Sequence, residues 1–599
     1  MAQKKNKKDL KEQKEVKEIW NLNDILGAET YENILKKVEK NIKFIENSRK
    51  LLSNDVSASV VFNLIKISEE TGSLLSRAGG YYSLKSSENT KDEDALAKLS
   101  ALSMISSDIE TRTLFFELWF ISLDDSPSKR LIESSELQKY RYFLESLKDH
   151  KPYTKSEEVE KILSIKDVTG GDSFSSLYDM HVSSYKFKFM DKKEATQEEV
   201  MSFYTSPNPK LRKKAYELIY SKYKEDSVFL SEIYKSIVLD WYNEIVKIRG
   251  YKSSISARNM SNKIDDKSVE IFLKVVRKNT PMFAEYFKLK HKILNLSGQK
   301  YEFSRVHIYA PFELKEKKYS YLESKKMVLD TFKSFDVRFY DAAKKVFDEK
   351  HIHSHPSPGK RGGAFCSSIN KSITPYVLLN YTEKLRDVST MMHELGHAVH
   401  DVFSSKQTDL LAHPKIPLAE TASIFAETLL EHRLIKESKD KKEKIALLIS
   451  SIDSHYQSIP RQTYLVLFEI WAHERIKEGA TKKEMDDYYH SLLVEQFGEM
   501  NIPEIFDHEW NYIPHIHHTP FYTYAYAWGN LLVLAFYAMY KEQGAKFVDK
   551  YIEFLSSGAS KSTTDIMLAM GANPSSEAFW QKGFDMIKEE IEELKKLTK

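Results

Sequence analysis

Apolar residues recur along most of this chain at the three- and four-residue spacing of an amphipathic α-helix. One such stripe consists of Leu96, Leu99, Leu102, Ile105 and Ile109. Another, near the C-terminal end, consists of Phe584, Ile587, Ile591 and Leu594. Residues at these spacings share one helix face, because 3.6 residues make one turn. The pattern predicts helices joined by short polar turns over residues 20–147, and long helices over residues 210–248 and 266–294.

The helical pattern is interrupted in the middle of the chain. Short apolar runs typical of strands occur at residues 301–303, 306–309 and 376–379, with a helix predicted between them at residues 321–332. An earlier interruption, over residues 149–207, favours a loop or a pair of short strands near residues 186–193.

A helix start is predicted just before residue 200. Thr196 is a good N-cap, and Glu198 and Glu199 supply an acidic first turn. We place a boundary here, which divides the chain into residues 1–200, a helical scaffold or lid region, and residues 201–599, a region that contains every candidate catalytic motif of the chain.

The composition agrees with a mostly helical protein. Only 19 glycines and 16 prolines occur in 599 residues, and 30% of the residues are charged. The 90 Lys and Arg nearly balance the 87 Asp and Glu, so the net charge of +3 predicts no nucleic-acid partner. No run approaches the roughly 18 consecutive apolar residues of a membrane span, which predicts no membrane partner.

The cellular location is predicted from the cysteine content and the N-terminus. Cys366 is the single cysteine, so no intrachain disulfide can form, which fits a reducing compartment. Residues 1–18 are basic and then mixed in charge, without the apolar stretch of a signal peptide. We interpret the lysines of residues 4–8 as a solvated tail. The sequence therefore predicts a cytoplasmic protein, and it carries no signal for an oligomeric state.

The strongest chemical signal is the run His393-Glu394-Leu395-Gly396-His397. Two histidines four residues apart on a helix point the same way, so their imidazoles can converge on one metal ion. Glu394 lies beside them as a general base. This arrangement is typical of zinc peptidases.

A catalytic zinc ion needs a third protein ligand. Glu420 and Glu427 lie seven residues apart in an otherwise apolar segment, and we expect Glu420 to bind the metal. Glu427 would then hydrogen-bond a ligand histidine. His400 is the alternative third ligand, but three side chains spread over two turns of one helix converge poorly on a tetrahedral ion.

Two further segments suggest how a substrate is handled. Gly362 and Gly363 precede a predicted strand, and paired glycines permit the close approach of a peptide that adds as an extra strand. His351, His353 and His355 would share one strand face, but a metal site there would lack a base. The segment 515–528 is rich in His and Tyr, whose N–H and O–H groups can stabilise a developing oxyanion.

Together these motifs resemble the oligoendopeptidase F group of the thimet oligopeptidase-like zinc metallopeptidases. The resemblance rests on residues 393–400, on Glu420-x-x-Ser423-x-x-x-Glu427, on the glycine-rich segment 359–366 and on the His-then-Tyr segment. It covers roughly residues 200–590 by motif.

The resemblance implies a mostly α fold, a multi-helical ellipsoid with a deep central channel and a small β-sheet near the zinc site. It implies one zinc ion held by His393, His397 and Glu420, and oligopeptide substrates. It maps the oxyanion donors to a histidine and tyrosines of the His-then-Tyr segment. His515 fits best, and His517 and His518 are the alternatives. Tyr522, Tyr524 and Tyr526 all remain open for that role; we assign Tyr522 as the donor and expect Tyr524 and Tyr526 to contact substrate.

Two other functions are compatible with the same residues. A zinc carboxypeptidase or dipeptidyl carboxypeptidase would need a cationic anchor for the terminal carboxylate, which Arg461 or Lys360 would supply. A peptide-binding protein without catalysis is disfavoured by the intact Glu394, since a binder needs no base.

Overall fold

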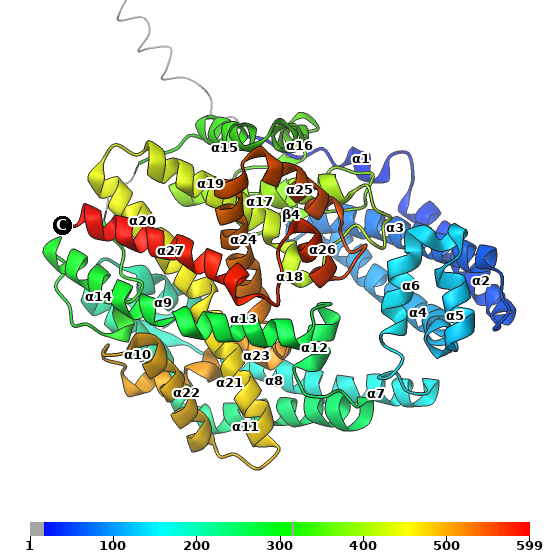
Figure 1. Cartoon of the computed structure of the whole chain (residues 1–599), viewed down its shortest axis with the longest axis horizontal. Coiled ribbons are helices and arrows are strands. Elements are labelled where there is room, and N and C mark those ends of the chain that lie inside the picture. Colours follow the sequence, from blue (N-terminus) through cyan, green and yellow to red (C-terminus); the bar gives the residue numbers. More distant parts are fainter. Residues whose placement is uncertain (1–16, 314–316) are drawn as a thin grey trace, which may run out of the picture.

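The computed structural model describes residues 17–313 and 317–599, and it is built almost entirely of helices (Figure 1). Residues 1–16, which include most of the segment interpreted above as a charged tail without a signal peptide, lie outside the described residues. The described chain contains no helix long and apolar enough to cross a membrane.

The N-terminal helices gather at one end of the molecule, on the right of Figure 1. They are α1 (Asn23–Leu26), α2 (Tyr31–Ser48), α3 (Ala58–Glu88), α4 (Glu93–Ser122), α5 (Asp125–Ile132) and α6 (Arg141–Lys148). They share a core of their own, to which α4 contributes mainly Phe115, Phe116 and Phe120. The helices predicted here are therefore confirmed. The stripe predicted on α4 is only partly correct, because Leu102 is buried while Leu96 is 47% exposed.

The following segment contains the predicted strand pair and a series of long helices. It comprises α7 (Glu157–Thr169), α8 (Gly171–Ser183), β1 (Phe187–Phe189), β2 (Lys192–Ala195), α9 (Gln197–Met201), α10 (Pro209–Glu225), α11 (Ser227–Trp241), α12 (Ser256–Ser261), α13 (Asp266–Asn279) and α14 (Pro281–Leu296). Thr196 caps α9 as predicted, in a capping box with Glu199. The single helix predicted over residues 266–294 is two helices, because Pro281 starts α14, where its missing N–H breaks the hydrogen-bond ladder.

A small three-stranded sheet lies close to the centre of the molecule. It consists of β3 (Ile352–His353), β4 (Phe365–Ser367) and β5 (Tyr376–Leu378), in the order β3-β5-β4. Strand β4 pairs with β5 in antiparallel register, with Cys366 opposite Val377, and no described strand pairs with its other edge. The strands predicted at residues 301–303 and 306–309 are wrong, since residues Arg305–His307 form a 3₁₀ turn whose neighbours pack as loop.

The remaining helices surround this sheet and supply the largest core. They are α15 (Tyr321–Phe335), α16 (Val337–Asp348), α17 (Leu385–Ser404), α18 (Ile416–Ala419), α19 (Thr421–Glu437), α20 (Lys441–Ser458), α21 (Pro460–Ile476), α22 (Lys482–Phe497), α23 (Pro514–His518), α24 (Tyr524–Gln543), α25 (Ala545–Ser556), α26 (Thr563–Met570) and α27 (Glu577–Leu597). The stripe predicted on the last helix is confirmed, because all four of its residues are buried. Helix α17 lies at the centre of this region, packed along α19 and α16 (Figure 1).

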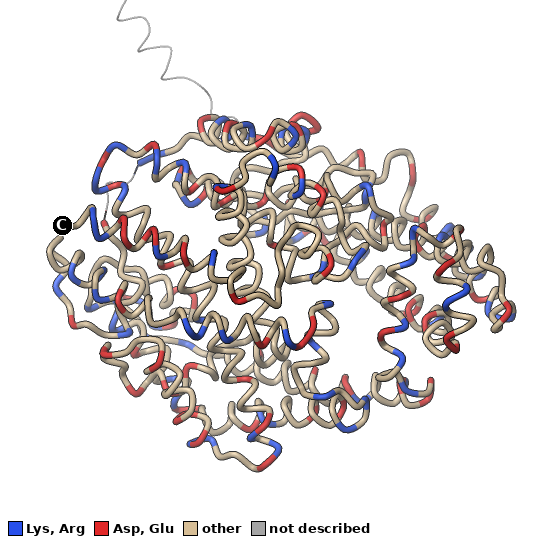
Figure 2. Tube along the Cα trace, in the orientation of Figure 1, with Lys and Arg blue, Asp and Glu red and all other residues tan. Residues whose placement is uncertain are grey.

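Charges of both signs are interspersed over the whole molecule (Figure 2). This distribution agrees with the near-zero net charge. The mostly helical fold with a small sheet is thus as predicted. The deep central channel stays a prediction.

Candidate active site

The site is built on α17, whose two faces have different partners. Its apolar face, which includes Met391, Met392 and Leu395, is fully buried in the core, whereas His393 and His397 point away from it and are partly exposed. The start of the helix is fixed by Asp387, whose carboxylate accepts hydrogen bonds from the backbone N–H groups of Thr382 and Lys384. The amphipathic pattern of the sequence thus sets which way the histidines face.

Three side chains converge on one point. His393 Nε2 lies 3.2 Å from His397 Nε2 and 3.4 Å from Glu420 Oε2, and His397 Nε2 lies 3.2 Å from the same oxygen. Two ligands bound at about 2.1 Å to one tetrahedral ion are separated by about 3.4 Å, so the observed spacing fits a zinc site. No other such group of three His, Cys, Asp or Glu occurs among the described residues.

A hydrogen bond fixes the tautomer of one ligand histidine. His393 Nδ1 lies 2.9 Å from Glu427 Oε1, so Nδ1–H donates to the carboxylate and the lone pair of Nε2 faces the other two ligands. Ser423 Oγ donates to Glu420 Oε2 at 2.8 Å and steadies the third ligand. His400, the alternative third ligand, is buried and does not belong to the converging group.

The charges of the site also fit a divalent cation. Glu394, Glu420 and Glu427 place three carboxylates around two imidazoles. Burial disfavours the charged forms, but the neighbouring carboxylates raise the pKa of His393 to about 9, and His397 and His393 lower the pKa of Glu420 to about 2. A site that favours the charged form of His393 in this way has a surplus of negative charge, which a bound cation offsets.

Glu394 lies between two cavities that meet at the metal ligands. One cavity, of about 430 Å³, is lined by Gly363, Asn380, Arg386 and Glu427, and the other, of about 470 Å³, by Cys366, His400 and Asp401. Glu394 and His393 line both. Burial raises the pKa of Glu394, although the two ligand histidines oppose the shift, and none of the described residues hydrogen-bonds its carboxylate.

A close backbone contact holds α17 against α19. A Cβ atom on Gly396 would lie 2.6 Å from the Cα of Ser423 and 2.8 Å from the carbonyl oxygen of Ala422. Only glycine permits this approach, which brings Glu420 and Glu427 within reach of the histidines. Gly396 was not among the residues predicted to matter, and its place inside the His-Glu-x-x-His motif was the available signal.

The glycine-rich segment leads into β4 at the mouth of the first cavity. Gly363 has a φ of +79°, and its carbonyl accepts a hydrogen bond from Asn380 Nδ2 at 2.7 Å. The preceding loop is tied to the N-terminal helices, because the N–H of Arg361 donates to the carbonyl of Ser87. Gly362 has open space around its Cα, and the strand that follows keeps one edge free.

The His/Tyr segment separates into exposed and buried members. His517 is fully buried and stacked on Tyr178, and His518 pairs with Asp179. Of the three histidines, His515 is the one with no such contact to a described residue outside the segment. Its ring lies 6.1 Å from that of Tyr522 and 5.7 Å from that of Tyr526. Burial lowers the pKa of His515, with smaller contributions from His518 and Arg461, which favours the neutral imidazole.

Tyr524 does not belong to this group. Tyr522 and Tyr526 are half-buried, and their rings lie 5.2 Å apart in an edge-to-face contact. Tyr524 points the other way into the core, where it is fully buried and accepts a hydrogen bond from Asn262 at 2.7 Å. The expectation that Tyr524 contacts substrate is therefore wrong, because the helix periodicity turns it away from its neighbours.

A buried carboxylate holds the turn in front of Tyr522. Phe521 has a φ of +59°, which is strained for a bulky residue, and its N–H donates to Glu469 Oε1 at 2.7 Å. Glu469 is fully buried, and burial raises its pKa to about 8 although Phe521 and Arg258 oppose the shift. Nothing in the local sequence around Glu469 indicated this role.

The other candidate groups have structural partners. His351 hydrogen-bonds the carbonyl of Thr374, and His353 packs against Trp20, so the three alternating histidines do not converge on a metal. Lys360 donates to three backbone carbonyls, and Arg461 pairs with Glu509 at 3.3 Å. Neither cation is therefore available to anchor a substrate carboxylate.

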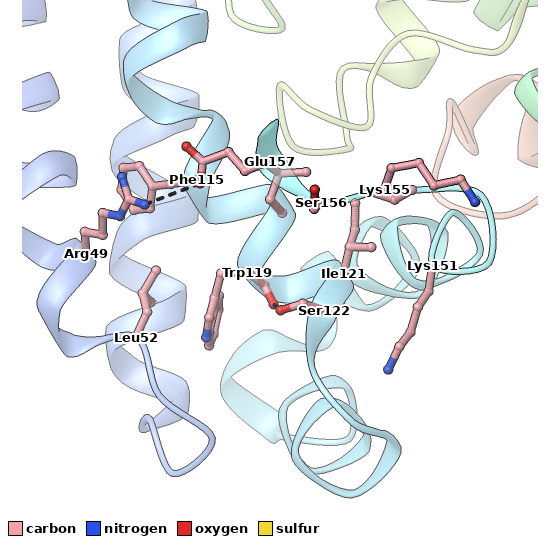
Figure 3. A pocket seen from close by; sticks show the side chains of 12 residues that line it. Arg49, Leu52, Phe115, Trp119, Ile121, Ser122, Lys151, Lys155, Ser156 and Glu157 are labelled. Atoms are coloured by element: carbon pink, nitrogen blue, oxygen red, sulfur yellow. Dashed lines mark hydrogen bonds and ion pairs between the residues drawn. The ribbon is translucent and has the colours of Figure 1, made fainter. Parts of the chain in front are cut away.

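A separate cavity of about 550 Å³ lies between the N-terminal helices and α7, where an ion pair joins Arg49 and Glu157 (Figure 3). Phe115, Trp119 and Ile121 form its apolar wall. Its lining holds no histidine or cysteine.

The fold and the converging ligands define a helical metallopeptidase of the His-Glu-x-x-His type. Comparison with known proteins makes the assignment specific. Residues 202–586 match the model of Peptidase family M3, and residues 119–187 match that of Oligopeptidase F. The chain therefore belongs to peptidase family M3 and is a metalloendopeptidase, which confirms the resemblance drawn from the motifs.

Individual relatives agree over nearly the whole chain. The chain is 28% identical to the chromosomal oligoendopeptidase F of Lactococcus lactis subsp. cremoris, over 97% of each protein. It is 25% identical to oligopeptidase PepF of Bacillus subtilis, over 96% of this chain and 87% of that protein. A solved structure of oligoendopeptidase F from Enterococcus faecium covers 94% of this chain and 98% of its own, with a TM-score of 0.71 at 20% identity, and so shares the fold. A Chlamydophila abortus structure reaches a TM-score of 0.85 at 24% identity, over 96% of this chain and 98% of its own.

Proposed function

We propose that the chain is a zinc-dependent endopeptidase that hydrolyses internal bonds of oligopeptides, with Glu394 as general base. The observation that carries the proposal is the convergence of His393, His397 and Glu420 at 3.2–3.4 Å, with the unpartnered carboxylate of Glu394 beside them. A zinc ion held by these three residues would supply Lewis-acid chemistry, acidifying water and polarising a carbonyl.

Glu394 takes a proton from the attacking water and later delivers it to the leaving amine. Its position between the two cavities places it beside a peptide that passes from one to the other. Burial, which raises its pKa, makes the carboxylate a stronger base than an exposed glutamate.

The free edge of β4 aligns the peptide. A substrate that adds as a fourth strand would hydrogen-bond the backbone of β4, and the absence of side chains at Gly362 and Gly363 leaves room for it where it enters. The strand begins next to the metal ligands, since Ala364, the residue before it, lines both cavities together with His393.

His515 and Tyr522 donate hydrogen bonds to the oxyanion, and Tyr526 contacts the substrate next to them. Two observations support these roles. The rings of His515, Tyr522 and Tyr526 lie close to one another, and helix α24, which carries Tyr526, packs next to the metal ligand Glu420. A Cβ on Gly529, one turn beyond Tyr526, would lie 4.0 Å from Glu420 Cβ. In this arrangement residues 1–200 remain a scaffold or lid region and residues 201–599 the catalytic region, as the sequence predicts.

The test is the Glu394→Gln variant, which keeps the size of the side chain but removes the base. Zinc content should stay at one ion per chain, measured by metal analysis, while turnover of an oligopeptide falls by several orders of magnitude. Near-normal cleavage by this variant would contradict the proposal. A non-catalytic binding protein would instead bind peptide equally with and without chelator and release no product.

The alternative function, a carboxypeptidase, is tested with a substrate whose C-terminus is amidated. The endopeptidase releases fragments from internal bonds of such a peptide, seen by mass spectrometry. Products that arise only when the C-terminal carboxylate is free would favour the carboxypeptidase.

A further inference from the structure

Arg386 stands out among the arginines because its guanidinium has no partner among the residues that the structure describes. The side chains of the other arginines each make a hydrogen bond, an ion pair or a contact with an aromatic ring. Its side chain is exposed and lines the 430 Å³ cavity next to the metal ligands.

The position of Arg386 is not explained by stability. It is the second residue of α17, where the positive end of the helix dipole disfavours a cation. The neighbouring Asp387 does not compensate, because its carboxylate caps the helix through Thr382 and Lys384. Glu427, on the same cavity wall, is engaged by His393. The charged side chains of this cavity that remain free to contact a substrate are thus Glu394, the proposed base, and Arg386.

The spacing along α17 fixes how far this cation lies from the cleaved bond. Arg386 precedes His393 by seven residues, which is nearly two turns, so both project from the same side about 10 Å apart along the axis. An extended peptide advances about 3.3 Å per residue. The guanidinium therefore reaches a group two or three residues from the cleaved bond.

The direction of the peptide follows from β4. The cavity of Arg386 is lined by Gly363 and Ala364 at the N-terminal end of this strand, and the other cavity by Cys366 and Ser368 at its C-terminal end. A peptide that pairs with β4 in the commoner antiparallel sense runs its C-terminal half toward Arg386. The opposite cavity is lined by Asp401 and by no Lys or Arg, so the cavity of Arg386 is the one of the two that offers a cation to a substrate carboxylate.

We propose that Arg386 determines specificity by binding a substrate carboxylate two or three residues C-terminal to the cleaved bond. This inference rests on the peptidase function proposed above. A guanidinium matches a carboxylate with two parallel hydrogen bonds. Because Arg386 is exposed, the pair is partly solvated and gives a preference rather than a requirement, which leaves longer and blocked peptides as substrates.

The carboxylate has two sources, the C-terminus of a short peptide and an Asp or Glu side chain within a longer one. Matched peptides separate them. One pair ends two residues after the cleaved bond as a free acid or an amide, and a second pair, amidated, carries Glu or Gln at that position. We expect the free acid to have a KM three- to tenfold below that of its amide. If the Glu peptide has a KM lower than the Gln peptide by a similar factor, Arg386 also binds acidic side chains.

The variant Arg386→Gln should bring the acid-to-amide ratio of KM close to one, and Arg386→Lys should restore part of it. Arg475→Gln, which removes an exposed arginine paired with Glu478, is the matched control and should keep the wild-type ratio. Equal ratios in wild type and Arg386→Gln would overturn the proposal.

The same ratio can be measured without turnover. In the Glu394→Gln background, fluorescence anisotropy of labelled acid and amide peptides reports binding alone, and the double variant with Arg386→Gln should lose the three- to tenfold preference. A preference that survives in the double variant also overturns the role of Arg386. If the metal-loaded wild type cleaves none of the peptides, the proposed peptidase function fails, while the binding ratio still decides the role of Arg386.

Discussion

Gly396 and Ser423 bring two helix backbones into direct contact: a Cβ on Gly396 would lie 2.6 Å from the Cα of Ser423. The contact joins the helix that carries His393 and His397 to the one that begins beside Glu420. The metal site is thus assembled by a glycine that takes no part in the chemistry.

The substitution Gly396→Ala should therefore disturb both stability and metal binding. The added methyl group meets backbone rather than a flexible side chain, so α17 and α19 must separate, at a cost of about 1–3 kcal/mol. We expect a lower melting temperature and weaker zinc binding, measured by thermal unfolding and chelator competition. Gly529→Ala is the control, because its nearest new contact, 3.5 Å from the carbonyl of Pro417, is an ordinary one. Equal behaviour of the two variants would contradict this account.

Glu427 should contribute to zinc affinity without touching the metal. Its hydrogen bond to His393 Nδ1 holds the imidazole in the metal-binding tautomer, and loss of such a partner weakens binding by about 10- to 100-fold. Glu427→Ala should show this loss in a competition titration. Glu437→Ala, which removes an exposed carboxylate from the same helix, should not. A zinc affinity unchanged in Glu427→Ala would refute the role.

The tyrosines of residues 522–526 should separate by function. Tyr522→Phe removes a proposed oxyanion donor and should lower kcat about 100- to 1000-fold, with little change in melting temperature. Tyr524→Phe removes the partner of Asn262 in the core, so it should lower stability by about 1 kcal/mol and leave kcat nearly intact. Steady-state kinetics and thermal unfolding of both variants test this. A large loss of kcat in Tyr524→Phe together with a normal kcat in Tyr522→Phe would contradict the roles given to these two tyrosines.

Glu469 should make stability fall with rising pH. Its pKa is raised in the folded state, to about 8, so the folded protein binds this proton more tightly than the unfolded chain does. The resulting stabilisation is fully present below the ordinary pKa of glutamate and is lost as the pH rises through 8. Between pH 6 and pH 8 the loss amounts to about 2 kcal/mol.

The variant Glu469→Gln keeps an acceptor for the N–H of Phe521 but cannot titrate, so its stability should change less over this range. Urea unfolding at pH 6, 7 and 8 measures the difference. Glu474→Gln, an exposed glutamate on the same helix, is the control and should follow the wild type. Parallel curves for wild type and Glu469→Gln would contradict the raised pKa.

Local sequence predicted what depends on neighbours within a turn or two. The spacing of His393 and His397, the cap at Thr196 and the apolar face of α27 are set by helix periodicity and side-chain chemistry, and the structure contains all three. The strand predictions at residues 301–309 failed, because short apolar runs fit a strand and a buried loop equally well.

The sequence by itself determined the helical class, the zinc-binding pair with its adjacent glutamate, and the family. Only the tertiary structure decided between Glu420 and His400 as the third group beside the histidines, since Glu420 comes 23 residues after His397 and is placed by the backbone contact of Gly396 with Ser423. It also decided that Tyr524 is buried while Tyr522 and Tyr526 remain accessible, and that Arg386 has no partner. Such features depend on which elements pack together, and contacts between residues far apart in the chain leave no periodic signal in the sequence.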